Sequence, residues 1–186
     1  MIDNSKNFRS FFCTLKNDTY FYTGCKELCL KSIIANIIFN ASLQLLLLYR
    51  CSHFCYIRGW YKLASFFEWL QIVMFSCRIE KRAYIGRNFK IAHSIGIVIG
   101  LANIGNNVSI WQNVTIGASG REKEKGKYPT IEDNVKIFAN AIVVGNIQIA
   151  KNATISAMSF VNIDVPVGTT VVGIPARIIK KNSQKK

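Results

Sequence analysis

Residues 131–161, IEDNVKIFANAIVVGNIQIAKNATISAMSFV, place an aliphatic residue at every sixth position. The period extends back to residue 79, with a one-residue slip after Ile97 and an interruption at residues 117–130. The periodic residues are Ile79, Ile85, Ile91, Ile97, Ile104, Ile110, Ile116, Ile131, Ile137, Val143, Ile149, Ile155 and Val161. A six-residue repeat indicates a β-helix, in which each repeat forms a short strand and a corner, and three repeats form one coil. Because one coil cannot bury its own apolar side, we expect about four to five stacked coils.

The first part of the chain follows a helical period instead. Polar residues recur every four positions between residues 32 and 49, at Ser32, Asn36, Asn40 and Gln44, which predicts one helix with a polar stripe. The amides in this segment make it a poor membrane span. A second, aromatic-rich helix is predicted over residues 60–76. The expected organisation is an α-helical region (1–77), a β-helix domain (78–176) and a basic C-terminal tail (177–186).

The net charge of +14 would suit nucleic acid, an anionic membrane or a phosphate-rich small molecule. Basic and aromatic residues do not interleave as in nucleic-acid-binding proteins, so we expect no nucleic-acid partner. The N-terminus, MIDNSKNFRSFF, lacks the apolar core of an export signal, which predicts a cytoplasmic protein. All six cysteines precede residue 78 and are expected to be reduced thiols.

A metal site could be drawn from Cys51, His53 and Cys55, with Cys25 and Cys29 upstream. The segment has no CxxC pair, however, and cysteines one helical turn apart are more often packed thiols. The sequence therefore predicts no metal.

His93 is the only histidine in the repeat region, and no charged residue follows it until Arg121. It is either a buried structural histidine or a proton-transfer group on an apolar wall. The interruption at residues 117–130, GASGREKEKGKYPT, is a polar insertion at one corner. Such insertions often map to a binding face, although a tolerated surface excursion gives the same pattern.

Five segments, by order and spacing, resemble the left-handed β-helix acyltransferases, most closely serine acetyltransferases and their short relatives encoded with surface-polysaccharide genes. The segments are HSIGIVIG (93–100), IGNNVSIWQNVTIGASG (104–120), YPTIEDNVKI (128–137), GNIQIAKNATI (145–155) and VVGIPARII (171–179). The resemblance implies a mainly β fold, a left-handed parallel β-helix preceded by a short α-helical region. It also implies acetyl transfer from acetyl-CoA to a hydroxyl group, and homotrimers with active sites between neighbouring β-helices.

The resemblance assigns His93 as the general base that takes the proton of the attacking hydroxyl. Neutral imidazole suits this task near pH 7, since its ordinary pKa is about 6.5. The family binds coenzyme A through backbone amides beside small residues, with positive charge near the phosphates. The corresponding positions are Gly117, Ala139 and Ala157, with Arg177 and Lys180 at the end of the last coil.

Three positions depart from serine acetyltransferases. The aspartate that orients the family's catalytic histidine is Arg78 here, and Glu80, on the same side of the strand, is the expected substitute. The acidic residue directly before the histidine is Ala92, and a second active-site histidine is Tyr128. Tyr128 is a candidate substrate-binding residue. Without the two acids, which would anchor an ammonium group, the sequence favours a sugar hydroxyl in surface polysaccharide synthesis as the acceptor, with serine as the alternative.

Gln112 and Asn113 lie one coil beyond His93 and are candidate acceptor-binding residues, although amides that stack at corners would look the same. If the acceptor is lipid-linked, the basic, aromatic-rich N-terminal helices could rest on the inner face of the membrane. Two rival interpretations share the fold. A γ-class carbonic anhydrase needs three histidines in the repeats, and a non-catalytic solenoid would not depend on His93.

Overall fold

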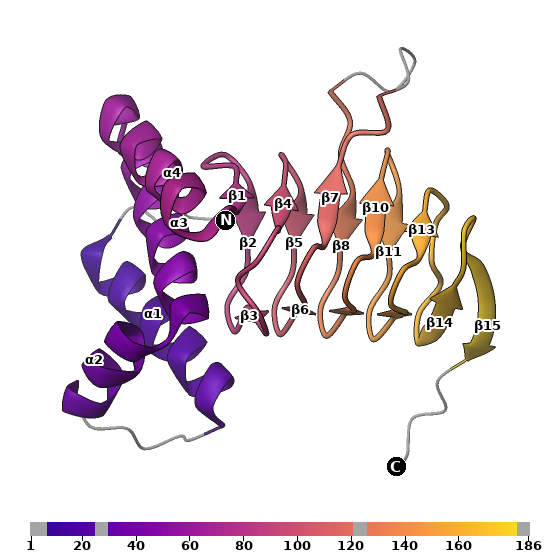
Figure 1. Ribbon diagram of the computed structural model, residues 1–186, viewed down its shortest axis with the longest axis horizontal. Helices are drawn as coiled ribbons and strands as arrows, with labels where there is room; N and C mark the ends of the chain where they lie inside the picture. Colours follow the sequence, from indigo (N-terminus) through magenta and orange to yellow (C-terminus); the bar gives the residue numbers. More distant parts are fainter. Residues whose placement is uncertain (1–6, 25–29, 121–125, 182–186) are drawn as a thin grey trace.

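The computed structural model describes residues 7–24, 30–120 and 126–181. Figure 1 shows helices packed at one end of a column of short strands. The helices are α1 (Phe8–Thr23), α2 (Leu30–Phe39), α3 (Ala41–Ile57) and α4 (Tyr61–Phe75). The strands are β1 (Arg78–Ile79), β2 (Tyr84–Ile85), β3 (Lys90–Ile91), β4 (Val98–Ile99), β5 (Asn103–Ile104), β6 (Ser109–Ile110), β7 (Thr115–Gly117), β8 (Thr130–Ile131), β9 (Lys136–Ile137), β10 (Ile142–Val144), β11 (Gln148–Ile149), β12 (Thr154–Ile155), β13 (Phe160–Val161), β14 (Thr169–Val172) and β15 (Arg177–Lys181).

The strands form three sheets that make the three sides of the β-helix, and all pairings are parallel except that of β14 with β15. Sheet A contains β1, β4, β7, β10 and β13, sheet B contains β2, β5, β8 and β11, and sheet C contains β3, β6, β9, β12, β14 and β15. The predicted periodic aliphatic residues all lie inside, each at most 4% exposed. Each strand from β1 to β14 buries one aliphatic side chain, and the parallel strands bond to strands of neighbouring coils, so the core is continuous along the axis.

The slip in the repeat lies earlier than the sequence predicted. Ile79 pairs with Ile99, not Ile97, and Ile99 pairs in turn with Ile116. Ile99 follows Ile91 by eight positions and precedes Ile104 by five, so the extra residues belong to the corner that carries His93. Ile97 and Ile99 are both buried, because alternate residues of a strand face the same side, and the six-residue count could not separate them.

Corners are formed by residues in the left-handed region, which asparagine adopts more readily than most residues. Six asparagines have φ between 57° and 61°: Asn88, Asn107, Asn113, Asn134, Asn140 and Asn152. Their amides stack, since Asn88 Nδ2 donates to Asn107 Oδ1 at 2.7 Å and Asn107 Nδ2 donates to Asn134 Oδ1 at 3.0 Å. This ladder satisfies the corner amides from one coil to the next.

The predicted single helix over residues 32–49 is wrong. The chain breaks at Asn40, whose Oδ1 accepts from the backbone N–H groups of Ser42 and Leu43 and so caps α3. The resulting segments, 31–39 and 41–57, are bent by 101°. The predicted second helix is confirmed as α4. Within the described residues, no single helix is long and apolar enough to cross a membrane, and only the bent pair passes that test, by length and composition.

A buried ion pair fastens the helices to the first coil. Arg50 on α3 donates from Nε to Asp18 Oδ2 on α1 at 3.0 Å, and its terminal nitrogens donate to the carbonyls of Ile85 and Gly86 at 2.6 Å. Asp18 Oδ1 also accepts from the backbone N–H of Phe89 at 3.0 Å. The side chains of Arg50 and Asp18 are only 7% and 2% exposed, so the junction excludes water.

The C-terminal residues 177–181 form β15 rather than a frayed tail. β15 runs antiparallel to β14, with Val172 opposite Arg177 and Thr169 opposite Lys181. The last parallel strand would otherwise present an unpaired edge, and this pairing satisfies its backbone groups. The rest of the predicted tail, residues 182–186, lies outside the described residues.

Candidate active site

The corner between β3 and β4 carries His93 and is two residues longer than a regular corner. The backbone ladder to the next coil includes Ala92, whose N–H donates to Ile110, and resumes at Ile95, whose carbonyl accepts from Asn113. His93 and Ser94 lie between these bonds and form the insertion. His93 is exposed, which excludes the interpretation as a buried structural histidine.

The same edge of the β-helix, between sheets C and A, carries three of the predicted site residues in successive coils. These are Gln112, Ala139 and Ala157, placed in line by the ladder bonds Asn140 N–H to Gln112 O and Met158 N–H to Ala139 O. Trp111 and Phe138 stack along this edge with ring centroids 4.3 Å apart. The structure therefore brings His93, Gln112, Ala139 and Ala157 onto one side of the column.

The two candidate acceptor-binding amides behave differently. Asn113 donates from Nδ2 to Asn140 Oδ1 at 3.0 Å, so its amide belongs to a corner stack. Gln112 Oε1 is buried and has no hydrogen-bond partner among the described residues. A buried acceptor left unpaired is costly, and this makes Gln112 the better candidate for contact with a donor group of a substrate.

Gly117 and Tyr128 lie at a different edge, between sheets A and B, where the chain leaves the column after β7 and returns to it at β8. The described parts of this insertion project beyond the strands (Figure 1). A Cβ added to Gly117 would meet no atom within 4 Å, whereas one added to Gly100 would lie 2.7 Å from Tyr128 Cε1. The Tyr128 ring thus rests on Gly100 at the end of β4. Within one chain, Gly117 and Tyr128 are separated from the His93 edge by the face of sheet A.

The edge of His93 fits an extended ligand. Ala139 and Ala157 place only methyl groups there, and Arg177 is exposed on β15 at the C-terminal end of the column (Figure 1). Lys180 also belongs to β15, where it pairs with Thr170 of β14. Small side chains followed by a terminal positive charge suit a long molecule that carries phosphates at one end.

The prediction that Glu80 orients His93 finds no support in the contacts of Glu80. Its Oε1 accepts from Arg82 Nε at 3.0 Å, and its Oε2 accepts from Arg78 Nη2 at 3.5 Å. Arg78 also donates from Nε to Glu68 Oε1 at 3.0 Å. Both oxygens of Glu80 are therefore engaged by arginines. Glu68 and Arg82 were not predicted as site residues, although a lone carboxylate in the apolar α4 indicates a buried charge with a partner.

The described residues contain no group of three histidine, cysteine or acidic side chains that could hold a metal ion. His53 Nδ1 lies 2.9 Å from the carbonyl oxygen of Lys81, and burial raises the pKa of the Cys51 thiol to about 11. A thiolate ligand would need a lowered pKa. Cys25 and Cys29, the other members of the conceivable site, lie outside the described residues.

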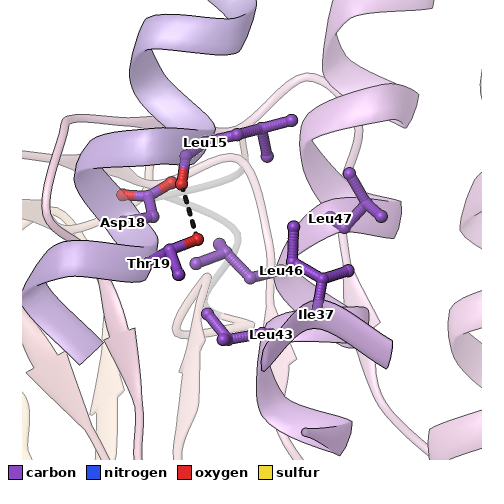
Figure 2. Close-up of a pocket in the computed structure, with 7 residues that line it drawn as sticks. All are labelled: Leu15, Asp18, Thr19, Ile37, Leu43, Leu46 and Leu47. Carbon is purple, nitrogen blue, oxygen red and sulfur yellow. Dashed lines mark hydrogen bonds between the residues drawn. The ribbon is translucent and has the colours of Figure 1, made fainter. Parts of the chain in front are cut away.

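A small, partly open cavity between α1, α2 and α3 is not the active site. Figure 2 shows it lined by leucines together with Asp18 and Thr19, whose hydroxyl donates to the Leu15 carbonyl. Its volume of about 10 Å³ holds one water molecule at most. It lies in the helical region, among the elements that fasten the first coil.

Comparison with known proteins places this geometry in a family, although no family model matches the chain. The serine acetyltransferase of Bacillus licheniformis is 38% identical over 176 residues, which cover 94% of this chain and 81% of that protein. The chain belongs to the serine acetyltransferase family.

Two solved serine acetyltransferases share its fold. That of Brucella abortus, in complex with coenzyme A, matches with a TM-score of 0.84 and 27% identity, covering 95% of this chain and 70% of the other. That of Neisseria gonorrhoeae, in complex with serine, matches with a TM-score of 0.83 and 30% identity, covering 95% and 72%. The family confirms the predicted left-handed β-helix with its helical N-terminal region, and an acetyl-CoA-dependent O-acetyltransferase.

Proposed function

We propose that this serine acetyltransferase family member transfers the acetyl group of acetyl-CoA to the hydroxyl group of serine, with His93 as general base. The observation that carries the proposal is the exposure of His93 on an inserted corner, on the edge that also carries the small residues Ala139 and Ala157. The relatives are named for serine, and one solved neighbour contains it, which supports serine over the sugar favoured by the sequence.

The chemistry assigned to His93 is proton transfer. A neutral ring nitrogen accepts the proton of the acceptor hydroxyl while the hydroxyl oxygen attacks the thioester carbonyl. The ring then returns the proton as the thiolate of coenzyme A leaves, so the imidazole is regenerated. Assistance of this kind is typically worth about 10²- to 10⁴-fold, and alignment of the two substrates along the edge supplies further acceleration.

A sugar hydroxyl remains the second candidate, because specific residues favour it. Arg78, Ala92 and Tyr128 replace the two acids and the histidine expected of a serine-binding site. An ammonium group entering a water-poor site needs a negative partner, and these positions offer none. The corresponding biological role would be O-acetylation of a sugar in surface polysaccharide synthesis.

The test is a thiol-release assay with purified protein, acetyl-CoA and either L-serine or a panel of sugars. We expect release that depends on the acceptor, and its loss in His93→Ala with an unchanged far-ultraviolet spectrum. Acceptor-independent release, or full activity in His93→Ala, would refute the proposal. Thiol release with sugars but not with serine would show that the acceptor is a sugar hydroxyl, the second candidate.

A homotrimer is part of the proposal. Apolar side chains beside the His93 edge are exposed in the single chain, among them Ile95, Val98, Ile142 and Met158. Exposed apolar surface of this kind favours association. Light scattering after gel filtration should give three times the chain mass of 21.0 kDa, and a monomer at micromolar concentration would contradict it.

We also propose a cytoplasmic location with peripheral contact to the inner face of the membrane. Phe66, Trp69 and Val73 on α4 are about half exposed, near Lys62, and the described cysteines are free thiols. Apolar and basic residues on one helix suit an anionic lipid surface. Flotation with anionic vesicles at low salt tests this contact, and protein remaining at the bottom of the gradient would exclude it.

A further inference from the structure

A row of alternating charges runs where α4 meets the first coil. Lys81 Nζ lies 2.8 Å from Glu68 Oε2, Glu68 Oε1 lies 3.0 Å from Arg78 Nε, and Glu80 bridges Arg78 and Arg82. The carboxylate side chains are 7% and 11% exposed, whereas those of Arg78 and Arg82 are 57% and 48% exposed. The negative groups therefore lie beneath, and the guanidinium groups face outward.

The buried carboxylates hold the two guanidinium groups but leave most of their donors unused. A guanidinium has five N–H donors. Within the described part of the chain, Arg82 uses only Nε, and Arg78 uses Nε and Nη2. Because the side chains are already ordered, a ligand that binds the remaining donors loses less conformational entropy. Three cations face two carboxylates in the row, which leaves one positive charge uncompensated.

Arg78 lies on the face of sheet A, between the two corners that carry the predicted site residues, and Arg82 lies in the corner between β1 of sheet A and β2 of sheet B. Arg78 pairs in sheet A with Val98 of β4, the strand that directly follows the His93 corner. The hydrogen bond that Arg82 donates to the Glu80 carboxylate raises the pKa of Arg82, and Tyr56 and Tyr128 lie close enough to add to this effect.

We propose that Arg78 and Arg82 form an anion-binding site that recognises a carboxylate or phosphate group of the acceptor. This inference rests on the proposed acetyl transfer and names its substrate class. An acceptor's anionic group binds the outward N–H donors, while its hydroxyl is presented at the active site. The amine of serine is then dispensable and even repelled, whereas its carboxylate is required.

The test compares acceptors that differ only in charge. Galactose, galacturonate and galactose 6-phosphate share a ring and differ at C6, and serine is compared with serinamide and with 3-hydroxypropionate. Thiol release at fixed ionic strength gives kcat/KM for each. We expect the anionic member of each set to exceed the neutral or cationic one by about tenfold or more, the usual value of a charge-assisted hydrogen bond. The carboxylate and phosphate sugars show which anion is preferred.

Arg82→Gln and Arg78→Gln should each reduce this preference about tenfold while the KM for acetyl-CoA stays within about twofold. Arg82→Lys should retain part of it. The matched control is Arg87→Gln, an exposed arginine whose described hydrogen bonds are made by its backbone. Equal kcat/KM for galactose and galacturonate in the wild type, or an unchanged preference in both arginine variants, would overturn the proposal.

Failure of the proposed function is distinguishable from failure of the anion site. If no acceptor releases thiol, the activity is refuted, and binding is then measured directly by titrating inorganic phosphate and galacturonate into the protein in a calorimeter. Binding that weakens about tenfold in Arg82→Gln but not in Arg87→Gln supports the anion site. No detectable binding of either anion to the wild type refutes it.

Discussion

The buried pair of Asp18 and Arg50 gives a sharp prediction about stability. Arg50→Met leaves the Asp18 carboxylate buried without its partner and removes the donors to two backbone carbonyls. Breaking a buried pair in this way typically costs about 3–5 kcal/mol. At about 2–4 °C per kcal/mol for a chain of this size, the midpoint of thermal unfolding should fall by roughly 6–20 °C.

The double variant Asp18→Asn with Arg50→Met should cost less than the sum of the two single variants. Removing the carboxylate's charge removes the penalty of leaving it unpaired, so we expect a coupling energy of about 1–3 kcal/mol. Circular dichroism at 222 nm, with thermal and urea unfolding of all four proteins, measures it. Additive costs would show that the pair does not act as a unit and would refute the reasoning.

The pH dependence supplies an independent check on the same pair. Burial raises the pKa of the Asp18 carboxyl above its ordinary value of 3.8, and the Arg50 guanidinium offsets only part of this rise. The folded chain therefore holds the Asp18 proton more tightly than the unfolded chain. Stability from this group increases as the pH falls through the folded pKa toward 3.8 and is lost again as the pH rises. The difference in unfolding free energy between wild type and Asp18→Asn should move in favour of wild type on acidification, and a shift in the opposite direction would contradict the raised pKa.

Three further outcomes are expected. His93→Ala should lower kcat about 10²- to 10⁴-fold while the unfolding midpoint stays unchanged, because the ring is exposed; a large drop in the midpoint would mean a structural role. Gly96→Ala should destabilise the chain by about 1 kcal/mol or more in urea unfolding, since φ is +64° and the new Cβ would clash with the side-chain oxygen of Asn113. A neutral result would argue against this corner geometry. In a variant with Cys13, Cys25 and Cys29 replaced by serine, the remaining thiols should react with a thiol reagent at pH 8 only after unfolding. The reason is burial, which raises the pKa of the Cys51 thiol to about 11. Rapid reaction in the folded state would disprove that burial.

The β-helix was predictable because its core uses one residue type at one spacing. Each coil repeats the same strand, so an error at a single position, such as Ile97 taken for Ile99, leaves the fold unchanged. The helical region offered no such redundancy. A polar stripe through Asn40 fits a continuous helix and a helix cap equally well, and packing against α1 and the first coil decided between them.

Site residues could be predicted from the sequence only where the side chain differed in chemistry from its neighbours in the aliphatic repeat. His93 stood out as an ionisable residue in an uncharged run, and the structure exposes it. Glu80 could not be assigned from spacing, because its partners Arg78 and Arg82 and the facing Glu68 come together only when α4 docks on β1. Gly117 and His93 lie at different corners of the β-helix. The order of residues in the sequence does not state which corner each one occupies, so their separation could not be predicted.

The positions of the proposed site residues follow from the way the repeat pairs its backbone groups. A regular coil bonds every backbone group to its neighbours and fixes each side chain in a column, so a regular corner has little freedom to aim a side chain. Residues outside the ladder are exempt from that constraint. His93 and Ser94 form one such insertion, and the described residues 118–120 and 126–128, between β7 and β8, belong to a second. Both insertions break few backbone hydrogen bonds of the ladder, so their sequences can change while the core stays the same. In the proposal above, Arg78 and Arg82 of the first coil, held by carboxylates beside α4, add specificity for the acceptor from outside the repeat.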